Sequence, residues 1–243
     1  MPTIVEFSSV SYEIDGTRIL DDLNLQIEKG EVLVLLGESG CGKTTTLKLI
    51  NRLIEPTGGE VVVEGKRATD WNAIELRRHI GYVLQEGGLF PHLTVEQNVG
   101  LVLDLQDRDP VSTRHRVEEM LDLVGLDALK FASRYPHELS GGQRQRVGVA
   151  RALAADPPIV LLDEPFGALD VITRTNLQKE FARLVGDLGK TAVFVTHDLH
   201  EAMLLGDRIA LMEKGKIVFL GSAEEFRFAD VPLAKAYLET ISV

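Results

Sequence analysis

The chain has 243 residues, of which 44% are hydrophobic and 26% charged, so it can bury the core of an α/β domain with a subdomain. Its net charge of −11 disfavours general binding to nucleic acid, and no apolar run approaches the ~20 residues that span a bilayer. The N-terminus does not resemble a signal peptide, and the single cysteine cannot form an internal disulfide. We therefore expect a cytoplasmic protein.

The predicted strands are of two kinds. Residues 3–27 and 58–65 alternate in polarity between turn residues, which is typical of an antiparallel sheet with one solvated face. Residues 208–212 and 216–220 flank a Glu-Lys-Gly turn and predict a hairpin, which we assign to the same kind of sheet. Continuous apolar runs predict buried parallel strands at Val32–Leu36, Ile159–Leu162 and Ala192–Val195.

Helical spacing of apolar side chains appears between these runs. Two examples are the set Val117, Met120, Leu121 and Val124 and the set Leu177, Phe181, Leu184 and Val185. Residues from about 88 to 156 carry mostly helical signals and predict an inserted α-helical subdomain. Strands that alternate with helices predict an α/β fold.

A glycine-rich segment follows the first predicted parallel strand. Residues 37–44 match the phosphate-binding pattern G-x-x-x-x-G-K-[ST], and a helical pattern with Leu47, Ile50, Leu53 and Ile54 follows. Glycines let several backbone N–H groups point at one phosphate, while Lys43 reaches the β- and γ-phosphates and the Thr44 hydroxyl binds Mg²⁺. The predicted nucleotide-binding residues of this segment are Gly37, Glu38, Ser39, Gly40, Cys41, Gly42, Lys43, Thr44 and Thr45.

Cys41 lies inside this segment, close to a predicted helix N-terminus and to Lys43. Both features lower the pKa of a thiol, so we expect alkylation of Cys41 to inactivate the protein and nucleotide to protect it. The alternative is that Cys41 is simply a small side chain that fits the loop.

An acidic pair ends another predicted parallel strand. Asp163 is placed to hold Mg²⁺ through water, and Glu164 is placed to polarise the water that attacks the γ-phosphate. Ligands bind beyond the carboxyl ends of parallel strands, so this pair and the glycine-rich loop are predicted to meet at one crevice.

Leu139-Ser140-Gly141-Gly142-Gln143 stands shortly before the acidic pair. With the other motifs it resembles the nucleotide-binding domain of ABC transporters over essentially the whole chain. The resemblance implies an α/β P-loop NTPase core with a parallel sheet, an N-terminal antiparallel β subdomain and the helical subdomain, all in one domain over residues 1–243. It also implies that Ser140, Gly141, Gly142 and Gln143 of one subunit contact ATP held by a second copy.

The family resemblance assigns four further residues. Tyr12 matches the aromatic that stacks on adenine, and His197 matches the histidine that contacts the γ-phosphate. Gln85 matches the glutamine that joins Mg²⁺, attacking water and membrane subunit, and Asp170 lies in the loop through which two active sites communicate. The implied catalytic residues are therefore Glu164, His197 and Gln85, and the implied Mg²⁺ ligands are Thr44, Gln85 and Asp163.

The partners follow from the same resemblance. Residues 43–56 and 77–83 resemble the ATPases of quaternary-amine importers, which carry glycine betaine, choline or carnitine. The implied partners are a second copy of the chain, membrane-spanning permease subunits that receive residues 87–95, and indirectly a substrate-binding protein. The implied location is the inner face of the cell membrane, and no C-terminal regulatory domain is expected.

Other interpretations stay open at this point. An importer ATPase for another small solute would carry the same motifs. Chromosome-maintenance ATPases of this type insert a long coiled coil for which the sequence has no heptads, and ribosome-associated relatives usually carry two such domains. A non-catalytic binding module would leave the intact Glu164 and His197 without a purpose.

Overall fold

The computed structural model describes residues 2–84, 88–166 and 171–241 of the chain. It divides into two compact units, one formed by Met1–Arg77 with Leu184–Val243 and the other by Arg78–Arg183. Among the described residues, no helix combines the length and the apolar character that a membrane span requires. The predicted organisation as a single domain stays a prediction.

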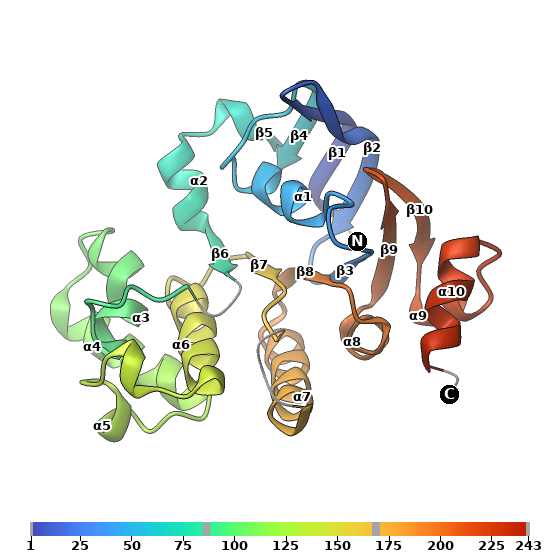
Figure 1. Ribbon diagram of the computed structural model, residues 1–243. Coiled ribbons are helices and arrows are strands. Elements are labelled where there is room, and N and C mark those ends of the chain that lie inside the picture. The colour runs from blue at the N-terminus through green and yellow to red at the C-terminus, as the bar shows by residue number, and fades with distance from the viewer. Residues whose placement is uncertain (1, 85–87, 167–170, 242–243) are drawn as a thin grey trace. The chain divides into compact units, whose positions relative to one another are not determined.

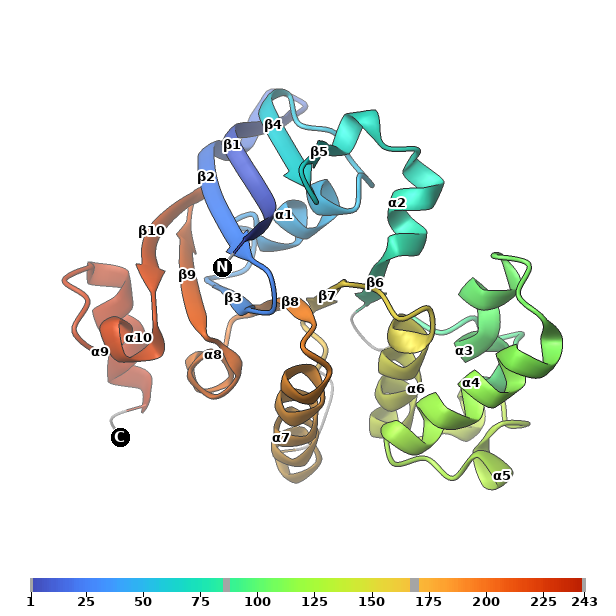
Figure 2. The same ribbon diagram turned by 180° about the vertical axis from the view of Figure 1, so that it is seen from behind.

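The first unit begins with an antiparallel sheet in the strand order β2-β1-β4-β5. Its bounds are β1 Thr3–Ile14, β2 Thr17–Glu28, β4 Gly58–Val63 and β5 Lys66–Arg67. The predicted alternation in β1 is only partial, because the adjacent Ile4 and Val5 are both buried, as are Phe7 and Val10. Helix α1 packs against β4 (Figures 1 and 2). A 3-10 turn (Ala68–Asp70) and helix α2 (Ala73–His79) follow this sheet.

The same unit contains the parallel strands that lead to the glycine-rich loop. Strand β3 (Val32–Leu36) pairs in parallel with β8 (Thr191–Thr196) and with β9 (Arg208–Glu213). Strand β10 (Lys216–Gly221) pairs antiparallel with β9. The predicted hairpin is therefore present, but its assignment to the antiparallel sheet was wrong, because β9 joins the edge of the buried parallel strand β3.

Helix α1 (Lys43–Ile50) is shorter than the apolar spacing predicted. Arg52 adopts a left-handed backbone with φ 52°, and the N–H of Leu53 turns back to donate to the carbonyl of Lys48 at 2.8 Å. These contacts end the helix, so Leu53 lies beyond it and is 47% exposed. The unit is completed by α8 (Leu199–Leu205), α9 (Ala223–Arg227) and α10 (Pro232–Ile241).

The second unit pairs two parallel strands, β6 (Ile80–Val83) and β7 (Ile159–Asp163). Between residues 88 and 156, all of them described, the elements are helical: α3 Val95–Asp104, α4 Pro110–Leu123, α5 Ala128–Phe131, a 3-10 turn at Pro136–Glu138 and α6 Gly141–Ala154. Helices α3, α4 and α6 pack on one another, and α7 (Val171–Leu188) follows β7 (Figure 1). The set Leu177, Phe181, Leu184 and Val185 lies on α7, whereas Val124 of the other set is the C-cap residue just beyond α4. Both sets are largely buried. The predicted α/β fold class is confirmed.

Candidate functional site: a phosphate loop and a second glycine-rich helix start

The segment between β3 and α1 curls because two of its glycines adopt a backbone that other residues rarely take. Gly40 has φ 82° and Gly42 has φ 108°. A Cβ on Gly42 would also lie 2.6 Å from a side-chain methyl carbon of Leu20 and 3.2 Å from the carbonyl oxygen of Ile19, so a side chain there would add crowding to the backbone strain. No side chain caps the start of α1. Phosphate binding by the backbone N–H groups of this curl stays a prediction.

Lys43 is the first residue of α1 and is 5% exposed. Its ammonium group donates to the carbonyl oxygens of Gly37 at 2.7 Å and of Glu38 at 2.8 Å. The two bonds fold the lysine back along the loop and hold its charge inside the curl. Thr44 and Thr45, the next two residues, are half-buried.

The expectation that Cys41 has a lowered pKa was wrong. The side chain is 7% exposed, and burial raises the pKa of its thiol although the nearby Lys43 acts in the opposite direction. A pocket of about 180 Å³ is lined by residues 38–41, by Met212, Glu213 and Lys214 at the end of β9, and by Leu233 of α10. Burial, which the sequence pattern did not reveal, therefore makes Cys41 a poor nucleophile.

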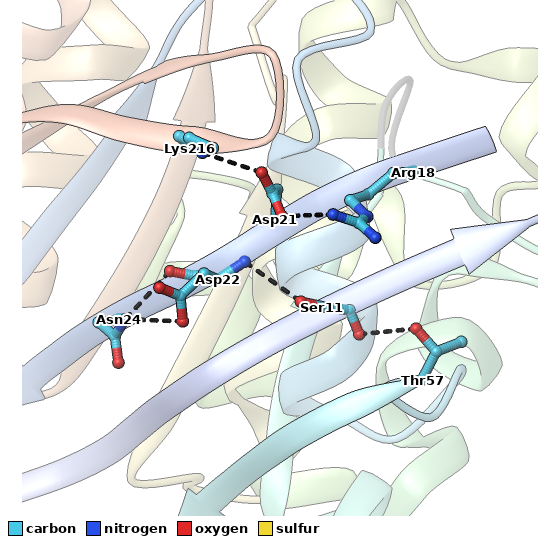
Figure 3. Close-up of polar contacts among 7 residues, drawn as sticks. All are labelled: Ser11, Arg18, Asp21, Asp22, Asn24, Thr57 and Lys216. Atoms are coloured by element: carbon cyan, nitrogen blue, oxygen red, sulfur yellow. Dashed lines mark hydrogen bonds and ion pairs between the residues drawn. The ribbon is translucent and has the colours of Figure 1, made fainter.

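Tyr12 lies near the end of β1, opposite Leu20 of β2, and is half-buried. The neighbouring Ser11 is held on both sides (Figure 3). Its hydroxyl accepts a hydrogen bond from the N–H of Asp22 at 3.2 Å, and its carbonyl accepts from the N–H of Thr57 at 2.9 Å. Strand β1 therefore presents Tyr12 from a backbone that is tied to both neighbouring segments.

His197 follows β8 directly and is exposed. Thr196 pairs with Leu36 at the end of β3, so His197 and Gly37 leave the sheet at the same edge. The Thr196 hydroxyl donates to Glu201 Oε2 at 2.5 Å and accepts from the N–H of Asp198 at 3.0 Å. Glu201, only 5% exposed, supports the turn that presents His197; its place in the first turn of α8 was its only sequence signal.

The Leu-Ser-Gly-Gly-Gln segment lies in the second unit and begins α6. Ser140 is the N-cap, and its hydroxyl accepts from the N–H of Gln143 while the Gln143 side chain accepts from the N–H of Ser140 at 2.9 Å. This capping box fixes the first turn. Gly141 and Gly142 follow at the helix start and are half-buried, so their backbone lacks the cover of a side chain.

The acidic pair also lies in the second unit. Asp163 is the last residue of β7 and accepts a hydrogen bond from the Tyr82 hydroxyl at 3.4 Å. Burial and the charge of Asp163 both raise the pKa of Tyr82, which keeps the hydroxyl protonated as the donor. Glu164 adopts a left-handed backbone with φ 44°. Glu64, in the turn after β4, has a similar backbone with φ 51°, so this conformation alone does not mark a functional residue.

The structure places Tyr12, the phosphate loop and His197 in one unit, and the Ser140–Gln143 segment with Asp163 and Glu164 in the other. Gln85 and Asp170 lie outside the described residues. The predicted convergence of the acidic pair with the phosphate loop stays a prediction. Tyr82 and Glu201 were missed, because neither carries a motif of its own.

Comparisons with known proteins agree with these features. A protein-family model described as ABC transporter matches residues 20–167. The choline transport ATP-binding protein OpuBA of Bacillus subtilis is 52% identical over 210 residues, which are 86% of this chain and 55% of that protein. The glycine betaine uptake system ATP-binding protein YehX of Escherichia coli is 48% identical over 219 residues, or 90% of this chain and 71% of that protein.

A solved structure of an ATP-binding cassette is also similar to this chain. The ATP-binding cassette MJ0796, described as a dimer in a post-hydrolysis state bound to ADP and Pi, matches with a TM-score of 0.81 and 37% identity. The match covers 90% of this chain and 99% of that one. The chain spans only about half the length of the choline and osmoprotectant relatives that it matches at 50% identity or more.

Proposed function

This chain belongs to the ABC transporter family, and from that premise we propose that it is the ATP-binding and ATP-hydrolysing subunit of an importer. The observation that carries the proposal is the curled loop of residues 37–44, in which the buried Lys43 donates from its ammonium group to the carbonyl oxygens of Gly37 and Glu38. Such a loop is specific for the phosphates of a nucleotide.

Each residue is given the role that suits its chemistry. Tyr12 would stack on adenine, the loop N–H groups and Lys43 would bind the β- and γ-phosphates, and His197 would contact the γ-phosphate. Glu164 would accept a proton from the water whose oxygen attacks the γ-phosphorus, so that the bond to the ADP oxygen breaks and ADP and phosphate leave. Gln85 and Asp170 keep the roles that the sequence assigns to them.

Mg²⁺ fits the donor atoms that the chain offers. The Thr44 hydroxyl and the Asp163 carboxylate are hard oxygen donors, both half-buried, and the sequence adds the amide oxygen of Gln85. These residues would hold the ion. Bound there, it would neutralise charge on the phosphate oxygens.

A second copy of the chain completes the proposed site. The start of α6 has a capping box and two glycines, but the nearest cation in the sequence, Arg144, donates to the Leu139 carbonyl at 2.6 Å. The α6 start would therefore contact a phosphate that Lys43 of the other copy already binds, through Ser140, Gly141, Gly142 and Gln143. The dimeric state of MJ0796 supports this arrangement.

Residues 87–95 are proposed as the contact with the permease. Phe90 is 43% exposed, yet its N–H donates to the fully buried Asn98 at 2.8 Å, and Asn98 donates back to its carbonyl at 3.1 Å. Arg151 donates to the Gly88 carbonyl at 2.9 Å, with its guanidinium over the Phe90 ring. An exposed aromatic on a rigidly held loop is suited to docking a partner.

The proposed cargo is a quaternary-amine osmoprotectant such as glycine betaine, choline or carnitine, with a substrate-binding protein delivering it. Identity of 52% to the choline transport protein and 48% to the glycine betaine uptake protein supports this choice. The chain would act on the inner face of the cell membrane. Uptake of radiolabelled glycine betaine, choline and carnitine into vesicles that carry candidate permeases with this chain tests the cargo, and uptake of none of the three would contradict it.

The test of the motor is steady-state MgATP hydrolysis by the purified chain and by Glu164→Gln. The variant keeps the shape of the side chain but loses the base, so turnover should fall about 10²–10⁴-fold. Size-exclusion chromatography in ATP should then show a dimer of the variant. Glu118→Gln, an exposed carboxylate on α4, is the matched control and should keep normal turnover. Near-normal turnover in Glu164→Gln would contradict the assignment.

A further inference from the structure

The turn between β9 and β10 touches both halves of the proposed nucleotide site in the first unit. The carbonyl of Gly215 accepts a hydrogen bond from the N–H of Asp21 on β2 at 3.1 Å. The N–H of the same residue donates to the carbonyl of Cys41 in the phosphate loop at 3.0 Å. One residue therefore ties the strand pair that carries Tyr12 to the loop that binds phosphate.

A second path joins the same two regions directly. Tyr12 pairs with Leu20 across the β1–β2 ladder. Leu20 in turn packs on the phosphate loop, because a Cβ at Gly42 would lie 2.6 Å from its side chain and 3.2 Å from the carbonyl oxygen of Ile19. Leu20, which lies opposite Tyr12, is thus in contact with the phosphate loop. The distance between Tyr12 and the phosphate loop therefore depends on this packing.

Gly215 is at a position that only glycine fills without displacement. Its φ is 81°, and a Cβ would lie 2.4 Å from the carbonyl oxygen of Ile19. A side chain there would have to push the turn away from β2. Gly16, in the turn between β1 and β2, has φ 75°, so a substituted side chain there would strain the backbone as at Gly215. It would meet no clash, because no atom lies within 4 Å of the place that a Cβ would take.

Ion pairs at Asp21 add to the backbone hydrogen bond that joins the β9–β10 turn to β2. Lys216 lies 2.9 Å from Asp21, and Arg18 also pairs with Asp21 at 3.0 Å (Figure 3). The two cations lower the pKa of the Asp21 carboxyl, with Lys216 as the larger cause. The ion pairs are partly exposed, so they add to the backbone bridge but do not replace it.

We propose that the β9–β10 turn, with Gly215 as its central residue, is a positioning element that sets the spacing between Tyr12 and the phosphate loop. This inference rests on the proposed nucleotide function, and it gives a role to a residue that no nucleotide-binding motif contains. If the spacing is correct, adenine contacts Tyr12 while the phosphates contact the loop, so the two contacts together raise the affinity for the nucleotide. If the turn moves, phosphate binding persists while the contribution of the adenosine part is lost.

The experiment compares Gly215→Ala with Gly16→Ala by calorimetric titration of MgADP and of Mg-pyrophosphate, which lacks the adenosine part. Gly215→Ala should weaken MgADP binding about tenfold and Mg-pyrophosphate binding by less than about threefold. Gly16→Ala should leave both affinities within about twofold of the wild type, although both variants lose some stability to backbone strain. A purely structural role would not separate the two ligands.

Equal loss of both affinities in Gly215→Ala, or no loss, would overturn the inference. Absence of MgADP binding in the wild-type chain would instead contradict the proposed function itself. If Gly215→Ala does not fold, Asp21→Asn gives the same comparison, with an expected two- to threefold loss for MgADP alone. Its control is Asp230→Asn, which removes an ion pair to Lys235 on α10. Identical MgADP affinities in these two variants would also overturn the inference.

Discussion

Two glycine-rich helix starts, at α1 and at α6, look alike in sequence but are built differently. The start of α1 has no side-chain cap and carries a buried lysine beside its curled backbone. The start of α6 is closed by the Ser140 capping box, and the arginine nearest to it in the sequence is engaged with the Leu139 carbonyl. The first therefore contains its own cation for phosphate, whereas the second offers backbone N–H groups. This difference explains why the second would act only on a phosphate that is already bound.

The comparison is tested most strongly at Lys43. Lys43→Ala removes the cation of the phosphate loop and leaves the carbonyls of Gly37 and Glu38 without their donor, so kcat/KM for MgATP should fall about 10²–10³-fold. MgADP affinity, measured by calorimetry, should fall with it. Lys48→Ala, on the exposed side of α1, is the control, and a similar loss there would mean that general positive charge suffices.

Ser140→Ala tests the other helix start. Loss of the cap should cost about 1 kcal/mol of stability and lower ATP turnover about tenfold, while MgADP affinity stays unchanged because the phosphate loop is intact. Ser222→Ala removes the equivalent capping box of α9 and controls for the lost cap. Turnover assays that show the same decrease in both variants would contradict a specific role of Ser140.

A smaller effect is expected at the turn that presents His197. Thr196→Val keeps the shape of the side chain but loses the bonds to Glu201 and to the N–H of Asp198, so kcat should fall about threefold to tenfold with little change in MgADP affinity. Thr191→Val, at the other end of β8, is the control, because it removes the hydroxyl that accepts from the N–H of Gly30 at 2.9 Å. Unchanged kcat in Thr196→Val would show that the turn holds without this network.

The smallest effect concerns Cys41. Because burial raises the pKa of its thiol, less thiolate is present at a given pH, and iodoacetamide should react more slowly with the folded chain than with the urea-unfolded chain. The rate should keep rising with pH beyond the range in which the unfolded control levels off. Mass spectrometry of the labelled peptide measures both rates, and faster labelling of the folded chain would contradict this account.

Local pattern by itself determined most of the fold. Apolar runs marked β3, β7 and β8 because strands covered on both faces need no polar residues, and helical spacing marked α4 and α7. The phosphate loop was also predictable, since its curl depends on glycines within one short segment. The start of α6 was predictable for the same reason, because a capping box spans only four residues.

Tertiary structure decided what depends on contacts between distant segments. The pKa of Cys41 is set by burial beside β9 and α10, so its expected direction was wrong. Strand β9 joins the parallel strands because its pairing partner β3 lies far from it in the sequence. Gly215 looks like an ordinary hairpin-turn residue until Asp21 and Cys41 are found on its two sides. Sequence pattern encodes local conformation, but burial and long-range hydrogen bonds arise only when the chain is folded.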